Sequence, residues 1–277
     1  DVCSSDLVNI ILDLLLILVI PLGVLGAAIA TLIAQAVSAV LVTVTLMYRT
    51  EGMKLCLSQI RMYKRMLQSI LKIGLPAGFE AIMYSISNII VQVSINNFGV
   101  DTMAAWTAYS KIDFIFWMIN SAFGISVMTF VGQNYGAGKW DRIRRGTKIC
   151  LGMALISAVS VSIILMSAER FLFGIFVNDA GVVEIGIRMM NVIAPAYLLF
   201  AFIEVFSGAL RAQGAVVVST LITMVGICVL RMIWVTLVAA HGTLEQVIIC
   251  YPITWAAGAL AMSIYYIYKQ RKIFQAR

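Results

Sequence analysis

Three polar side chains lie inside the first apolar runs of this sequence, where water is scarce. Asn9 and Asp13 are four residues apart, so a helix presents both on one face. Thr31 falls in the next apolar run, at a similar depth if that run turns back across the same layer. Carboxylate, amide and hydroxyl oxygens suit a proton or a hard cation such as Na⁺. In the alternative interpretation, Asn9 and Thr31 bond the backbone or each other, and Asp13 braces the helices.

A second set of polar and aromatic side chains recurs at helical spacing in the later apolar runs. We expect Asp113 and Arg231 to form a structural ion pair, shared with Lys111. We expect Glu80 and Glu204 to be a less compensated acidic pair that could exchange protons or, with nearby aromatic rings, attract a lipophilic cation. These side chains either line a wet substrate cavity or join helix to helix, and Glu204 could equally be a buried packing partner. The set is Glu80, Tyr84, Asn88, Asp113, Trp117, Asn120, Glu204 and Arg231.

The elements that must position these residues are long apolar helices. Of the 277 residues, 62% are hydrophobic and 12% are charged, whereas globular domains are about 45–50% apolar. Seven runs are long enough to cross a bilayer as complete helices, and residues 7–20 resemble the remnant of an eighth. The sequence therefore predicts an all-α integral membrane protein, a polytopic helical bundle. The complete helices are expected at 24–47, 73–98, 106–131, 149–177, 187–210, 215–240 and 247–268.

The net charge of +7 follows the topology of these helices. Sixteen of the 20 Lys and Arg residues fall within residues 49–72, 139–148, 211 and 269–277, which lie on one side if every run crosses. The opposite loops carry only acidic charge. The positive-inside rule then places the basic loops and the C-terminus in the cytoplasm, in an inner or plasma membrane. The excess of Lys and Arg therefore follows from the membrane topology, and it does not indicate that the protein binds nucleic acid.

The segment GQNYGAGKWDRIRRG, residues 132–146, combines glycines with basic residues, as phosphate-binding loops do. A P-loop requires Gly-Lys-Ser/Thr after a strand, whereas here Trp140 follows Lys139 and the preceding run has membrane length. We interpret the segment as a cytoplasmic turn between two helices, held by its arginines at the lipid headgroups. No catalytic or metal-binding motif and no histidine occurs in any predicted span, so we predict neither an enzyme nor a cofactor.

The first seven residues, DVCSSDL, are polar and acidic and are joined directly to the apolar run that begins at Val8. They resemble the in-frame translation of a common sequencing adapter, and they form neither a signal peptide nor a basic segment before an apolar one. We expect residues 1–7 to be an artefact, and the protein to begin further upstream.

Four short motifs occur in an order that resembles the multidrug and toxic compound extrusion (MATE) transporters: LGAAIAT (25–31), KIGLPAGFE (72–80), GQNYGAGKWDR (132–142) and SGALRAQG (207–214). The resemblance implies two six-helix lobes around a central cavity. It implies that the chain is the C-terminal two-thirds of such a protein, truncated at its N-terminus. The implied parts are the end of the first lobe (8–47), a cytoplasmic linker (48–72), the second lobe (73–268) and a cytoplasmic tail (269–277).

The same resemblance implies a function. It suggests a secondary active exporter, monomeric when full-length, that moves small organic cations out across the lipid bilayer in exchange for H⁺ or Na⁺ by alternating access. Asn9, Asp13 and Thr31 match a cation-coupling site in the first lobe of one branch of the family, with Na⁺ possible at Asp13. A lipid-linked oligosaccharide flippase of the same superfamily, with a more basic cavity, is one alternative. A non-functional truncated fragment is another.

Overall fold

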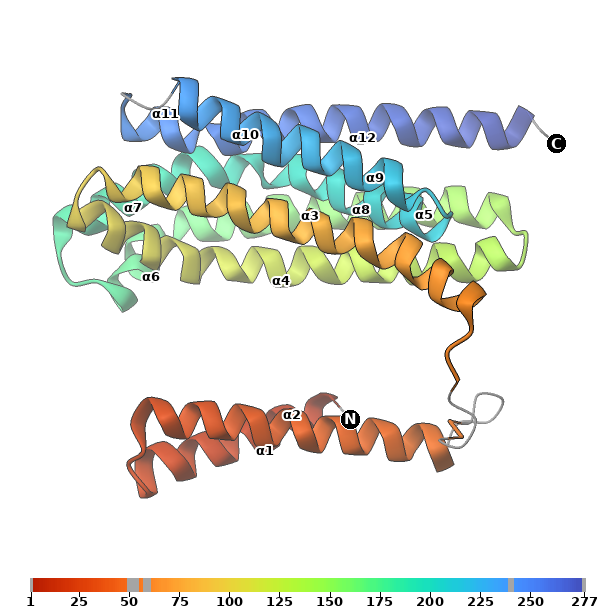
Figure 1. The fold of residues 1–277 in the computed structure, drawn as a ribbon. Helices are drawn as coiled ribbons and strands as arrows, with labels where there is room; N and C mark the ends of the chain where they lie inside the picture. The colour runs from red at the N-terminus through yellow and green to blue at the C-terminus, as the bar shows by residue number, and fades with distance from the viewer. Residues whose placement is uncertain (1, 49–54, 57–60, 239–241, 276–277) are drawn as a thin grey trace. The chain divides into compact units, whose positions relative to one another are not determined.

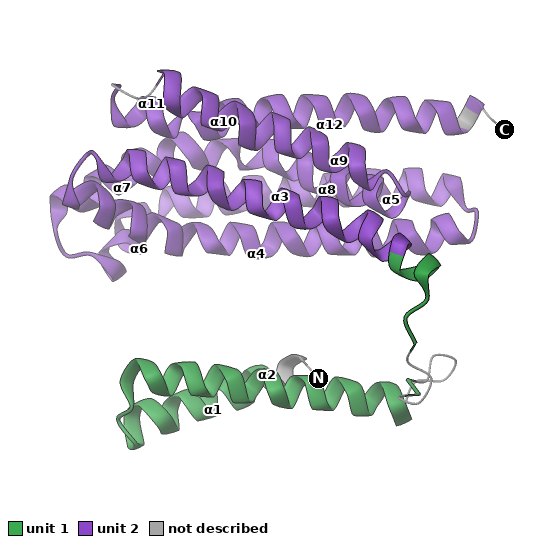
Figure 2. Ribbon diagram, in the orientation of Figure 1, with its two compact units in different colours: residues 1–67 green, residues 68–277 purple. Residues whose placement is uncertain are grey.

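The structure is a computed structural model that describes residues 2–48, 55–56, 61–238 and 242–275. Every regular element among these residues is helical (Figure 1). The chain divides into two compact units, Asp1–Leu67 and Gln68–Arg277 (Figure 2).

Unit 1 is a pair of packed helices. Helix α1 (Val2–Asp13) continues directly into the π-helix η1 (Leu14–Val19), and α2 (Gly23–Tyr48) runs back alongside. The buried residues of α2 are Gly26, Ala30 and Ala34, each four residues apart. Small residues at this spacing let two helices approach closely in a membrane, and an added Cβ at Gly26 would meet the Leu16 backbone.

Unit 2 contains the remaining helices. In the part of the chain that the structure describes, six helical segments of unit 2 are long and apolar enough to cross a membrane, and α2 in unit 1 is a seventh. The seven candidate spans agree in number with the complete helices predicted. The elements are α3 (Lys64–Asn96, beginning in unit 1), α4 (Val100–Gly136), α5 (Trp140–Ser167), α6 (Glu169–Phe176), α7 (Ala180–Ile193), η3 (Ala194–Ala196), α8 (Tyr197–Ala212), α9 (Val216–Thr223), η4 (Met224–Val229), α10 (Leu230–Ile233), η5 (Trp234–Val238), α11 (Leu244–Ile248) and α12 (Cys250–Gln275).

Several helices extend beyond the predicted bounds. The helix predicted at 106–131 is α4, Val100–Gly136, because its polar ends keep a helical backbone after the apolar run stops. The helix predicted at 149–177 begins earlier, at Trp140, and α5 ends at Ser167. A separate short helix, α6, comes after it. Hydropathy marks the part of a helix that suits lipid, not the part that is hydrogen-bonded as a helix.

The turn predicted at 132–146 is shorter than expected. Helix α4 continues to Gly136 and α5 begins at Trp140. Gly138, with φ of 67°, takes the left-handed conformation that reverses the chain. In the linker predicted at 48–72, residues 64–72 already belong to α3, and 49–54 and 57–60 lie outside the described residues.

Helix α8 lies at the centre of unit 2, packed against α4, α5 and α12. It is the most completely buried of these helices, with ten buried residues among its sixteen. Helix α3 instead exposes most of its side chains and buries only Ser87, Val91 and Ile95. Hollows remain between α3 and the rest of the bundle, and these contain most of the polar residues singled out in the sequence.

Candidate functional site

A hollow of about 470 Å³ opens between α3, α4, α7 and α12. Aromatic side chains form most of its wall, so we call it the aromatic hollow. Among the described residues that line it, Asp113 is the one with an ionisable carboxylate. The lining residues are Tyr84, Asn88, Gln92, Trp106, Tyr109, Ser110, Asp113, Phe114, Trp117, Ile193, Tyr251 and Trp255.

Neutral donors hold the Asp113 carboxylate. Tyr197 donates to one oxygen and the Trp117 indole to the other, each at 2.5 Å. The Tyr109 hydroxyl lies 3.2 Å from that of Tyr197 and extends the network. Asp113 and Arg231 form no ion pair, and Lys111 is exposed. The predicted ion pair was therefore wrong, because donors from α4 and α8 reach both oxygens of Asp113.

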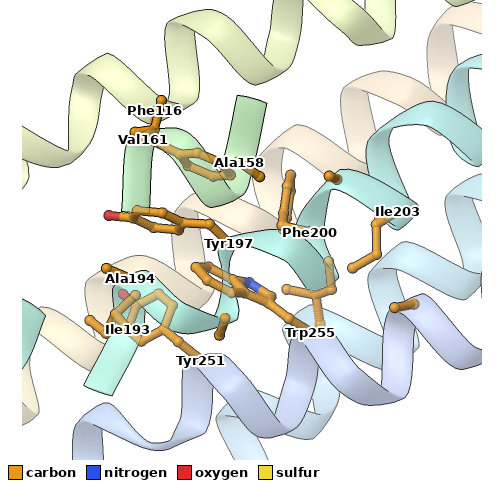
Figure 3. Close-up of a cluster of buried hydrophobic side chains, with 14 of the residues drawn as sticks. Phe116, Ala158, Val161, Ile193, Ala194, Tyr197, Phe200, Ile203, Tyr251 and Trp255 are labelled. Atoms are coloured by element: carbon orange, nitrogen blue, oxygen red, sulfur yellow. The ribbon is translucent and has the colours of Figure 1, made fainter. Parts of the chain in front are cut away.

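Stacked aromatic rings fix the position of this network (Figure 3). Tyr197 stacks on Phe116 with ring centroids 3.9 Å apart and planes 8° from parallel. Trp255 touches the rings of Tyr197, Phe200 and Tyr251. Rings packed in this way leave little rotamer freedom, so Asp113 is presented to the hollow in a defined orientation.

Arg231, on α10, is fully buried behind the aromatic hollow. Its Nη1 donates to the Asn88 side-chain oxygen at 3.1 Å, and its guanidinium lies 4.2 Å from the Tyr251 ring centroid. Its Nε and Nη2 have no hydrogen-bond partner among the described residues. Arg231 therefore contacts two residues of the wall without lining the hollow itself.

A second hollow, of about 340 Å³, lies between α3, α4, α8 and α9 and contains both glutamates; we call it the carboxylate hollow. Arg211 Nη2 contacts the two carboxylate oxygens of Glu80 at 2.7 and 2.8 Å, and Thr220 donates to Glu80 at 3.0 Å. Glu80 is thus compensated by a cation, contrary to the prediction. The predicted acidic pair is brought into one hollow, but only Glu204 lacks a hydrogen bond or ion pair among the described residues.

Gly124 makes room for the Glu204 side chain, and Gly208 lets α8 approach the backbone of α4. A Cβ at Gly124 would overlap the Glu204 carboxylate. A Cβ at Gly208 would lie 2.8 Å from the Gly124 carbonyl oxygen. Helices α4 and α8 approach this closely because neither position carries a side chain.

In unit 1, the predicted coupling residues are only partly assembled. Asn9 Nδ2 and Asp13 Oδ1 are buried without a hydrogen-bond partner among the described residues. Thr31 instead donates to the Ala27 carbonyl within its own helix, at 2.9 Å, and is exposed. No group of three or more potential metal-binding side chains of His, Cys, Asp or Glu occurs in the described part of the chain.

Of the other predicted site residues, Tyr84 borders both hollows, and Asn88 and Trp117 line the aromatic one. Asn120 is buried and lines neither. Sequence reasoning missed Gln92, Tyr251 and Trp255 as lining residues. Gln92 continues the four-residue spacing of Glu80, Tyr84 and Asn88. Tyr251 and Trp255 are also four residues apart. This spacing places residues on one face of their helix, so a signal was present for all three.

Comparison with known proteins agrees with this architecture. A family model described as MatE matches residues 76–237. The "Probable multidrug resistance protein YoeA" of Bacillus subtilis (strain 168) is 26% identical over 260 residues, which are 91% of this chain and 56% of that protein. The "Multidrug export protein MepA" of Staphylococcus saprophyticus is 25% identical over 250 residues, 85% of this chain and 55% of that protein.

The fold itself matches a solved structure. An outward-facing conformation of a multidrug resistance MATE family transporter of the MOP superfamily has a TM-score of 0.88 and 18% identity, covering 98% of this chain and 61% of that one. The chain thus spans between half and two thirds of the length of each of these three proteins. Since the family model covers more than half of its residues, this multi-pass helical membrane protein belongs to the MatE family.

Proposed function

We propose that the chain contributes the second lobe of a secondary multidrug exporter, and that the aromatic hollow of unit 2 binds small organic cations. The observation that carries this proposal is Asp113, a carboxylate held at the wall of a hollow lined by Trp and Tyr rings. A carboxylate attracts positive charge, and the faces of aromatic rings attract a desolvated cation by about 2 kcal/mol or more.

The charge of the lining favours an exporter of cations over the flippase alternative. A cavity for a lipid-linked saccharide, whose linker is a phosphate ester, calls for basic side chains. The described residues that line the aromatic hollow include Asp113 and no Lys or Arg. Arg231 is fully buried and does not line the hollow, so its guanidinium is not presented to a ligand there.

The driving ion is proposed to bind in unit 1. Asn9 and Asp13 retain buried polar atoms without partners among the described residues, and a proton or Na⁺ at Asp13 would satisfy them. Thr31 belongs to this proposed site through the family resemblance and would have to leave the Ala27 carbonyl to join it. Transport would result from alternating access of two lobes, with the basic loops and C-terminus in the cytoplasm.

The first experiment measures binding of tetraphenylphosphonium, a lipophilic cation, to the purified chain in detergent by equilibrium dialysis. Asp113→Asn removes the negative charge and keeps one acceptor oxygen for Tyr197, and should weaken binding at least about tenfold. Asp101→Asn is the matched control, since Asp101 is exposed in the first turn of the same helix. Equal affinity in wild type and Asp113→Asn, with unchanged unfolding temperatures, would exclude Asp113 as the cation site.

A second experiment separates binding from transport. The chain reconstituted in liposomes is tested for export of the same cation, driven by a proton or a sodium gradient. Gradient-dependent export that Asp13→Asn abolishes supports the exporter. Saturable binding without export under either gradient supports the alternative that the chain as given is a non-transporting fragment.

A further inference from the structure

We infer that a third hollow, at the basic end of unit 2, is a binding site for a phosphate group, from either an anionic phospholipid or a free phosphate anion. It has a volume of about 280 Å³ and lies between the first turns of α5 and the last turns of α12. We call it the basic pocket, and it is separate from both hollows described above. Its lining residues are Arg144, Lys148, Tyr266, Ile267, Gln270 and Arg271.

The lining has the chemistry of an anion site. Arg144, Lys148 and Arg271 contribute three positive side chains, and no described lining residue is acidic. An arginine fork matches two phosphate oxygens, and a lysine adds a compact positive charge. The Tyr266 hydroxyl is a further donor: it is buried and makes no hydrogen bond of normal geometry to the described residues, and the nearby Thr147 hydroxyl donates instead to the Ile143 carbonyl. A buried hydroxyl left without a partner costs free energy, and a phosphate oxygen would satisfy it.

The back of the basic pocket is built by packing. The Tyr266 ring stacks on Phe206 of α8, with centroids 4.5 Å apart and planes 18° from parallel. The Gln270 amide donates to the Gln213 side-chain oxygen at 3.0 Å, and Lys269 donates to the Gln213 backbone carbonyl at the same distance. Gln213 is itself 3% exposed. The side chains of Tyr266 and Gln270 are therefore held before any ligand arrives, which lowers the cost of ordering on binding.

The surroundings point to a lipid as well as to a free anion. Ile267 lines the pocket and is 50% exposed, and Ile264, one turn earlier on α12, is 60% exposed. Ile149 of α5 is also exposed. A phosphate in the pocket would have apolar side chains beside it, where acyl chains could lie. Basic pockets between transmembrane helices are known to take anionic headgroups.

The test is retention of lipid by the purified chain, measured by native mass spectrometry after exposure to phosphatidylglycerol or phosphatidylcholine. The variant Arg144→Gln/Arg271→Gln removes two charges from the pocket. The matched control Arg145→Gln/Lys272→Gln removes two charges one residue further along the same helices, from residues that do not line it. Tyr266→Phe removes only the hydroxyl. Unfolding temperatures are recorded for each variant to identify any that fails to fold.

We expect phosphatidylglycerol to be retained over phosphatidylcholine, and this preference to fall about tenfold in the pocket variant and severalfold in Tyr266→Phe. The control should keep the wild-type preference. If millimolar inorganic phosphate displaces the lipid, the site is a phosphate site open to the free anion; if it does not, the lipid is the ligand. Equal losses in pocket variant and control, or no preference in the wild type, would overturn the inference.

Discussion

Arg211 donates to both carboxylate oxygens of Glu80, at 2.7 and 2.8 Å, and so joins α8 to α3. The two residues are 131 positions apart in the chain. The hydrogen bond from Arg231 to Asn88 forms a second polar contact to the same helix. Because α3 borders both the aromatic and the carboxylate hollow, these two contacts position a shared wall of the candidate site.

Removing the charge of Glu80 should therefore destabilise unit 2. Glu80→Gln removes the carboxylate that pairs with Arg211. The side chains of Glu80 and Arg211 are only 14% and 28% exposed, respectively. We expect a loss of about 1–3 kcal/mol, since a partly buried charge is left without its partner. The measurement is the free energy of unfolding in detergent.

Glu184→Gln is the control for that change. It breaks the contact between Arg170 and Glu184, whose side chains are 81% and 56% exposed. Pairs this exposed contribute about 0–1 kcal/mol. Equal losses in the two variants would show that the contact between Glu80 and Arg211 is no stronger than a surface ion pair.

Gly208→Ala should force α8 away from α4. The added methyl group would lie 2.8 Å from the Gly124 carbonyl oxygen, and a backbone atom cannot rotate away as a side chain can. We expect a loss of about 1–3 kcal/mol, read from thermal unfolding. Gly132→Ala, on α4 with no atom within 4 Å of its added methyl group, should cost nothing. A stable Gly208→Ala variant would contradict this close approach of the helices.

Asn88 and Arg231 should show coupled effects on stability. Asn88→Ala removes the hydrogen-bond acceptor of a fully buried guanidinium, and should cost about 1–3 kcal/mol. Adding Arg231→Met should recover part of this loss, because an apolar side chain avoids the burial of an unpaired charge. Asn96→Ala, which breaks an exposed contact with Gln92 on the same helix, is the control. A double variant less stable than Asn88→Ala alone would contradict the argument.

If the proposed coupling ion binds at Asp13, Asp13→Asn should abolish the stabilisation of the chain by that ion. The unfolding temperature is measured at two sodium concentrations and two pH values, so that a response to Na⁺ is distinguished from one to protons. Binding to the native state raises stability, and that increase should vanish in Asp13→Asn. Asp6→Asn, at an exposed position on the same helix, should keep it. An unchanged response in Asp13→Asn would place the coupling ion elsewhere.

The helical fold and family membership were predictable from the sequence, whereas the side-chain pairings were not. Apolar runs of membrane length predict helices because backbone polar groups in lipid must bond internally. A similar depth from the outer ends of their helices predicts that Asp113 pairs with Arg231, whereas in the structure Tyr197 and Trp117 donate hydrogen bonds to Asp113. Depth along a helix axis does not say which neighbour a side chain faces.

By itself, then, the sequence determined the number of long helices, their apolar character and the motifs that mark the family. These are local properties, set by spacing and composition along the chain. Only the tertiary structure decided that Arg211 compensates Glu80, that Glu204 lies against Gly124, and that Tyr266 completes a basic pocket. Each of these depends on the rotation of one helix about its axis relative to another, which is set by the packing of many side chains together.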